Sequence, residues 1–227
     1  MIKAVLFDVD GTLIDSNDLH AAAWGEAFRH YGVDLPHEVI RSQIGKGGDN
    51  LIPALLPPDL AARKEEIDDL RGDLFKRCYL PRVVPFPGVG ALFERIYAEG
   101  KLIVLASSSG QEEVDYHLGL IGAAHLVHAT TSKDDVEHSK PCPDIFAAAL
   151  QKVQPTGAHE AVVVGDSPYD GEAARKLGIR TIGFRSGGFP DEALLGAGAA
   201  ELYDGAEDLL RRYDQSLLAS LEVSAPA

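Results

Sequence analysis

Residues 4–12 read AVLFDVDGT, and this stretch decides how the chain folds. Its first four residues are apolar without interruption, a pattern typical of a strand that helices cover on both faces of a parallel sheet. Comparable apolar runs follow later in the chain, the strongest at residues 102–106 and 161–164, and weaker ones at 126–129 and 181–184. We therefore expect a parallel sheet whose first strand ends directly before Asp8.

Amphipathic helical stretches alternate with these strands from about residue 86 onward. They cover residues 89–99, 111–118, 143–153 and 169–177. This alternation of strand and helix predicts an α/β fold with a doubly wound, Rossmann-like parallel sheet. We assign residues 1–16 and 83–227 to this core, with about 214–227 as a C-terminal tail whose last few residues are expected to be loose.

Residues 17–82 interrupt this alternation. The helical pattern there covers residues 17–31, 36–43, 50–56 and 58–79, with glycine and proline at the joins and no strand between them. We interpret the segment as an all-helical cap inserted after the first strand. Because the chain leaves and re-enters the core at neighbouring points, near Asp15 and Pro85, a hinge there would let the cap act as a lid.

The formal net charge of −14, from 35 acidic and 21 basic residues, argues against two classes of partner. Such a surface repels the nucleic-acid backbone and anionic lipid, so we expect no nucleic acid and no membrane as partner. The apolar N-terminal run is too short for a signal peptide, and no apolar stretch approaches the roughly 18–20 residues that span a bilayer. Two cysteines without metal-ligand spacing, Cys78 and Cys142, fit a reducing compartment. We expect a cytoplasmic protein that is a monomer or a simple homodimer.

Acids and hydroxyls follow the three strongest strands where each strand ends. Asp8 and Asp10 follow the first strand, Ser107 the second, and Asp166 and Asp170 the third. In open parallel sheets ligands bind beyond the carboxyl ends of the strands, so these side chains mark the expected site. If four carboxylates converge there, their mutual repulsion requires a cation or shared protons. Oxygen ligands favour a hard ion, and Mg²⁺ is the expected one.

Lys140 lies in the stretch SKPCPD at residues 139–144, where prolines stiffen the backbone. A lysine fixed at this edge of the sheet would neutralise carboxylates and a transferring phosphoryl group. The Ser107 hydroxyl would bind a phosphate oxygen, and the backbone N–H groups of Ser108 and Ser109 would add further donors at the start of a predicted helix. Together these groups indicate phosphoryl transfer.

Four motifs in this order resemble the haloacid dehalogenase-like superfamily. They are DVDGT at residues 8–12, Ser107 after its hydrophobic strand, Lys140 in SKPCPD, and GDSPYD at residues 165–170. The resemblance covers roughly residues 2–210. The helical insertion is similar to the cap of the phosphoglycolate phosphatase and β-phosphoglucomutase branch.

The resemblance implies a role for each matched residue. Asp8 would attack phosphorus and form an aspartyl-phosphate, and Asp10 would act first as general acid to the leaving alcohol and then as base to water. Ser107 and Lys140 would bind the phosphoryl group and orient the nucleophile. The Mg²⁺ ligands would be Asp8, the backbone carbonyl of Asp10 and Asp166, with Asp170 supporting the metal directly or through water.

On this basis we expect an Mg²⁺-dependent phosphatase of the haloacid dehalogenase type that hydrolyses a small phosphorylated metabolite. One alternative is a sugar phosphomutase with the same nucleophile, in which Lys46 or Arg41 would hold the distal phosphate. Another is a catalytically silent binding protein on the same scaffold, which the intact set of matched residues disfavours. Carbon–halogen cleavage is not expected, because dehalogenases of the superfamily lack the acid found here at Asp10. The setting of Lys46 does not match that of the Schiff-base lysine in phosphonate hydrolases.

The cap offers two candidate substrate contacts. Lys46 lies in a glycine-flanked stretch, and His20 lies early in the first cap helix. A purely structural role is the alternative for both, and the sequence leaves the same choice open for Arg41 and Asn50. Trp24 is expected to belong to the hydrophobic core of the cap.

Overall fold

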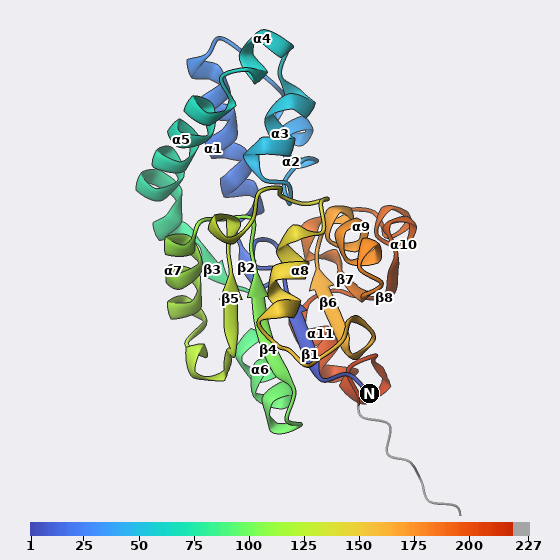
Figure 1. Cartoon of the computed structure of the whole chain (residues 1–227). Helices are drawn as coiled ribbons and strands as arrows, with labels where there is room; N and C mark the ends of the chain where they lie inside the picture. Colours follow the sequence, from blue (N-terminus) through green and yellow to red (C-terminus); the bar gives the residue numbers. More distant parts are fainter. Residues whose placement is uncertain (220–227) are drawn as a thin grey trace, which may run out of the picture.

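The core is built on a sheet of six parallel strands in the order β5–β4–β1–β6–β7–β8 (Figure 1). A computed structural model describes residues 1–219. The strands are β1 (Ala4–Phe7), β4 (Leu102–Ala106), β5 (Ala129–Thr131), β6 (Ala161–Gly165), β7 (Arg180–Phe184) and β8 (Ala199–Tyr203). The strand order reverses beside β1, because β4 and β5 lie on one side of it and β6 to β8 on the other. Open sheets bind ligands at such a switch point.

Helices cover both faces of the sheet, as the continuous apolarity of the strands predicts. They are α6 (Val89–Ala98), α7 (Gln111–Ile121), α8 (Asp144–Gln151), α9 (Pro168–Lys176), α10 (Asp191–Ala197) and α11 (Ala206–Arg211). Val5 and Phe7 of β1 pack with α6, α7 and α11 in one hydrophobic cluster. Ala4 and Leu6 pack with α8 and α9 in a second cluster on the other face. The doubly wound fold predicted from the sequence is therefore confirmed.

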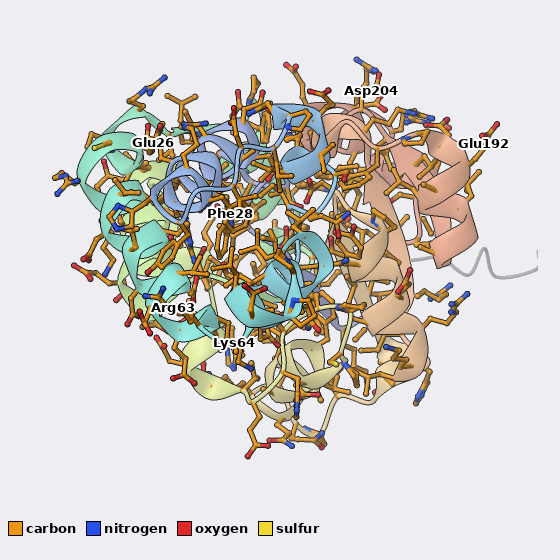
Figure 2. All side chains as sticks on the ribbon, turned by 90° about the horizontal axis from the view of Figure 1, so that it is seen from above. Glu26, Phe28, Arg63, Lys64, Glu192 and Asp204 are labelled. Carbon is orange, nitrogen blue, oxygen red and sulfur yellow. The ribbon has the colours of Figure 1, made fainter. Side chains whose placement is uncertain are left out.

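The chain between β2 (Ile14–Asp15) and β3 (Val84–Pro85) is helical and lies above the carboxyl ends of the strands (Figure 1). Its helices are α1 (Asn17–His30), α2 (His37–Arg41), α3 (Gly48–Leu55), α4 (Pro58–Ala61) and α5 (Lys64–Leu74), followed by a π-helical turn (Phe75–Tyr79) and a 3₁₀ turn (Leu80–Arg82). Trp24, Phe28 and Ile67 belong to a hydrophobic cluster within this cap. Figure 2 looks down on the cap and shows Phe28 among its inner side chains, whereas Glu192 and Asp204 lie at the outer edge of the molecule.

The two connections between core and cap run side by side. β2 and β3 pair antiparallel, with Ile14 opposite Pro85, and the Phe86 N–H donates to the Leu13 carbonyl over 2.9 Å. A change of backbone angles at this short ribbon would move the whole cap, which is the geometry that a hinge requires.

Several elements differ from the sequence-based prediction, which also did not include β2, β3, α10 and α11. The weak strand predicted at residues 126–129 is wrong: Leu126 ends a 3₁₀ turn and packs into the core, and β5 begins at Ala129. The helix predicted over residues 58–79 is interrupted between α4 and α5, where Arg63 lies 4.8 Å from the ring centroid of Tyr31. β8 was not predicted, because three of its five residues are not buried and it contains no continuous apolar run.

No helix within residues 1–219 is long and apolar enough to cross a membrane. The first part of the predicted tail packs on the core: Leu218 is fully buried, and the Leu217 N–H donates to Glu201 over 3.1 Å. The expectation of loose final residues falls on residues 220–227, which lie outside the described part of the chain.

Replacing Phe93 by alanine tests the packing of β1 against α6. Phe93 is fully buried, and its ring centroid lies 5.1 Å from that of Phe7. Phe93→Ala should lower the free energy of unfolding by about 3–5 kcal/mol, because it removes buried apolar surface and leaves a cavity. Tyr97→Ala in the same helix is the control, since that side chain is 56% exposed. Urea unfolding measures both variants, and an equal loss in the two would contradict this packing.

Candidate active site

Asp8 lies one residue beyond β1, at the switch point of the sheet. Its N–H donates to the Val164 carbonyl over 2.9 Å, so the backbone is still held by the neighbouring strand β6. Its buried carboxylate is fixed from two sides: Oδ1 accepts a hydrogen bond from the Lys140 ammonium, and Oδ2 accepts one from the Thr12 hydroxyl over 3.1 Å. Burial raises the pKa of Asp8 well above its usual range, although the charge of Lys140 acts in the opposite direction.

Lys140 is completely buried between two carboxylates. Its Nζ lies 2.8 Å from Asp170 Oδ1 and also contacts Asp8. Burial alone would lower the pKa of this lysine, but the charges of Asp170 and Asp8 outweigh it and raise the pKa above the ordinary value. The ammonium therefore stays charged, as the sequence-based prediction for Lys140 requires.

Three buried acids gather beside this lysine. One carboxylate oxygen each of Asp8, Asp166 and Asp170 lies within 4.8 Å of the other two. Asp166 accepts a hydrogen bond from Asn17 over 2.8 Å. The Thr12 hydroxyl lies 3.0 Å from Asp166 Oδ1, so its one proton is shared between Asp8 and Asp166. Burial and the nearby charge of Asp170 raise the pKa of Asp166 to about 6, because ionised carboxylates repel one another in this setting.

This acid cluster fits a divalent cation. Ionised, the three carboxylates carry three negative charges, of which Lys140 offsets one, and all their ligand atoms are hard oxygens of the kind that Mg²⁺ prefers. Asp170 is the least available ligand, because Oδ1 accepts from Lys140 and Oδ2 accepts from the N–H (3.1 Å) and hydroxyl (2.6 Å) of Ser167.

The hydrogen-bond partners of the Asp10 carboxylate lie outside the acid cluster. Its Oδ1 accepts from the Ser16 hydroxyl (2.6 Å) and lies 2.9 Å from His20 Nε2, and its Oδ2 accepts from the Ser109 hydroxyl over 3.1 Å. Burial favours the neutral acid, but His20 and Ser16 outweigh it and hold the pKa of Asp10 well below its usual range. The neighbouring acids Asp8 and Asp10 thus have opposite electrostatic environments.

His20 reaches this site from the first helix of the cap. Its ring stacks on Phe75, with 3.8 Å between the ring centroids, and its Nε2 faces Asp10. The sequence-based prediction placed His20 near substrate. The structure shows that its direct partner is the second acid of the motif, and that it also borders the cavity above Asp8.

The serines after β4 line the same edge. Ser107 Oγ lies 3.4 Å from Asp10 Oδ2 and accepts the Ser109 N–H over 3.0 Å. The buried hydroxyl of Ser108 has no hydrogen-bond partner within residues 1–219, and Ser108 borders the cavity. An unpartnered buried hydroxyl is costly, so Ser108 is a ready donor to a phosphoryl oxygen.

The cavity has a floor from the core and a roof from the cap. Asp8, Asp10 and Ser108 form part of the floor, whereas Trp24, Lys46 and Arg71 belong to the roof. Lys46 Nζ donates to Gln43 over 2.6 Å and lies 4.6 Å from the ring centroid of Tyr169. Partial burial lowers the pKa of Lys46.

Arg71 was not identified from the sequence. It donates to Asp68 over 2.8 Å and lies 4.9 Å from the centroid of the Trp24 ring, and its buried Nε has no partner within residues 1–219. Two other cap residues whose roles were open face elsewhere: Arg41 donates to Asp18 over 2.9 Å, and Asn50 donates to the Ser139 carbonyl over 3.1 Å.

Other contacts within the site also escaped the sequence analysis. They come from the hydroxyls of Thr12, Ser16 and Ser109 and from the amide of Asn17. Thr12 belongs to the DVDGT motif, and Ser16 and Asn17 follow it closely, so proximity to the motif was the available signal. No comparable signal marks Arg71.

Gly11→Ala tests how tightly the acid cluster is held. Gly11 has a φ of +80°, and a Cβ there would collide with Asn17 Nδ2 and Asp166 Oδ2. We expect Mg²⁺ to raise the melting temperature of the wild type and not that of the variant, because Asp166 must move to make room for the added Cβ. Gly100→Ala is the control, since its φ is +72° but a Cβ would meet nothing within 4 Å. Thermal unfolding with and without Mg²⁺ measures both. A retained Mg²⁺ effect in Gly11→Ala would contradict this account.

Comparison with known proteins agrees with the geometry. The haloacid dehalogenase-like hydrolase family matches the chain over residues 5–184. A phosphoglycolate phosphatase from Nitrosospira multiformis is 32% identical over 189 residues, covering 78% of this chain and 80% of that protein. A hydrolase structure from Pseudomonas syringae has a TM-score of 0.85 at 30% identity, covering 96% of this chain and 100% of that one. A Bacteroides vulgatus structure provisionally named beta-phosphoglucomutase has a TM-score of 0.82 at 26% identity, covering 94% and 88%. The chain therefore belongs to the haloacid dehalogenase-like hydrolases and is a phosphatase of that family.

Proposed function

We propose that the protein is an Mg²⁺-dependent phosphatase that hydrolyses a small phosphorylated metabolite through an aspartyl-phosphate on Asp8. The observation that supports this proposal most is that two neighbouring acids have different hydrogen-bond partners. Asp8 is fixed by Lys140 and Thr12 beside the acid cluster, whereas Asp10 is held apart by Ser16 and His20. Pairs of acids in contrasting environments are how one site provides both a nucleophile and a proton-transfer group.

Four groups would hold the metal ion. Asp8, Asp166 and the Asp10 backbone carbonyl would be direct ligands, and Asp170 would act through water because its oxygens already accept hydrogen bonds. A bound Mg²⁺ would offset the repulsion between the phosphoryl oxygens and the attacking carboxylate.

In the first step, an Asp8 carboxylate oxygen attacks phosphorus and the bond from phosphorus to the ester oxygen breaks. The leaving oxygen takes a proton that Asp10 passes on from the hydrogen bond it shares with His20 Nε2 over 2.9 Å, because the Asp10 carboxylate is itself ionised in the free site. Lys140, Ser107 and Ser108 would bind the phosphoryl oxygens. Lys140 fits this role because its buried ammonium already touches Asp8.

In the second step, Asp10 accepts a proton from water, and the water oxygen attacks phosphorus. The bond between Asp8 and phosphorus breaks, which restores the Asp8 carboxylate and yields inorganic phosphate. The cap, which we assign to residues 17–82, would close over the site and exclude bulk water during the first step. We place this activity in the cytoplasm, in a monomer or simple homodimer that uses neither nucleic acid nor membrane as partner.

A sugar phosphomutase is the second candidate. Lys46 and Arg71 favour it, because both cations line the roof of the cavity above Asp8. At this place they would bind the second phosphate of a bisphosphorylated sugar. A mutase returns the phosphoryl group to the bound sugar, so its product would be an isomer without net release of phosphate.

Phosphate release from a panel of phosphorylated metabolites tests the proposal. Activity should require Mg²⁺, disappear with chelator, and fall by about a thousandfold or more in Asp8→Asn, because the nucleophile is lost. Asp59→Asn is the control, since this cap acid is exposed. Isomer formation without phosphate would favour the mutase. Full activity of Asp8→Asn would contradict both.

A further inference from the structure

The cap touches the core at the residue before Lys140. The Asp49 carboxylate, in the first turn of α3, accepts hydrogen bonds from both the N–H (3.1 Å) and the hydroxyl of Ser139. The Gly47 N–H donates to the same hydroxyl over 2.9 Å. The approach is close, because a Cβ at Gly47 would lie 2.6 Å from Ser139 Cβ. A side chain at position 47 would therefore push cap and core apart.

Asn50 completes this contact through its amide group. Its Nδ2 lies 3.0 Å from Ser139 Oγ, 3.1 Å from the Ser139 carbonyl and 3.4 Å from the Lys140 carbonyl. The cap thus holds the backbone on both sides of the Ser139–Lys140 peptide. Ser139 is 8% exposed, so the contact is largely shielded from water and from competing hydrogen bonds.

The held peptide carries the lysine on which the nucleophile depends. Lys140 Nζ bridges Asp8 and Asp170, and it is fully buried. A small displacement of its backbone would change the contact with Asp8, since the buried ammonium is held between two carboxylates. In contrast, another contact between cap and core, from Lys133 to Asp68 over 3.3 Å, involves a partly exposed lysine away from Asp8.

We propose that Asp49 and Asn50 are positioning residues that link closure of the cap to the alignment of Lys140 with Asp8. When the cap closes, both residues hold Ser139, and the Lys140 ammonium is fixed where it orients the nucleophile and meets the incoming phosphoryl group. When the cap opens, this hold is released. The inference rests on the proposed function, because it assigns the contact a part in phosphoryl transfer.

The ¹⁵Nζ NMR signal of the Lys140 ammonium tests the link without requiring turnover. We expect Asp49→Ala and Ser139→Ala to shift this signal in the same way, because each removes one side of the same contact. The double variant should shift it no further. Asp59→Ala is the matched control in the cap and should leave it unchanged. Spectra are recorded before and after addition of Mg²⁺ and beryllium trifluoride. An unchanged signal in both variants and both states overturns the proposal, whatever the activity.

Binding of beryllium trifluoride tests the functional part. With Mg²⁺ it mimics a phosphoryl group on a carboxylate but has no leaving group, so contacts between cap and substrate do not contribute. Fluorescence of Trp24, the one tryptophan of the chain, reports binding because this residue borders the cavity. The affinity should fall about tenfold in Asp49→Ala and Ser139→Ala and not in Asp59→Ala. Equal affinity in all variants overturns the role in phosphoryl transfer. If the wild type neither binds beryllium trifluoride nor releases phosphate, the proposed function fails. The Lys140 NMR signal alone then decides whether the cap contact at Ser139 positions Lys140.

Discussion

The ion pair between Lys140 and the carboxylates of Asp8 and Asp170 is the interaction on which the site depends. Burying a charge is costly unless it is paired and hydrogen-bonded, and here a fully buried ammonium contacts both acids. Their backbones come from three separate places: the end of β1, the first turn of α9 and the loop before α8. The switch point of the sheet brings these places together, so the fold and the charge balance require each other. Removing Lys140 would leave both buried carboxylates without the cation that offsets their charge.

Besides lying over the site, the cap contacts residues of the core that belong to it. His20 contacts Asp10 from above, and Asn50 holds the peptide before Lys140. In the proposed mechanism, one cap residue therefore contacts the acid that transfers protons, and another holds the lysine that orients the nucleophile. Since the cap joins the core through the short β2–β3 ribbon, a single hinge movement would change both contacts together. Such coupling would let the enzyme assemble its full catalytic set only around a bound phosphate ester.

Much of the fold and of the candidate site could be predicted from the sequence. The physical reasons also explain which elements and residues the prediction missed. Buried central strands such as residues 161–165 are apolar throughout, and an acid directly after one of them must lie at the carboxyl edge of the sheet. The half-exposed edge strand β8 has no such pattern. Arg71 and the contact of Asn50 with Ser139 depend on how the cap is placed over the core. No local pattern encodes a side-chain contact between segments so far apart in the chain.

The most direct test of the account is to find the phosphoryl group on Asp8. A substrate from the phosphate-release panel is mixed with enzyme and Mg²⁺, the reaction is quenched in acid during turnover, and the protein is reduced with borohydride, which converts an aspartyl-phosphate to homoserine. Peptide mass spectrometry then locates the change. The account predicts homoserine at position 8, dependent on substrate and Mg²⁺. A protein that forms an acyl phosphate of known lifetime is the control for the quench. If the control is captured, homoserine at an acid other than Asp8, or no homoserine at position 8, would contradict the account.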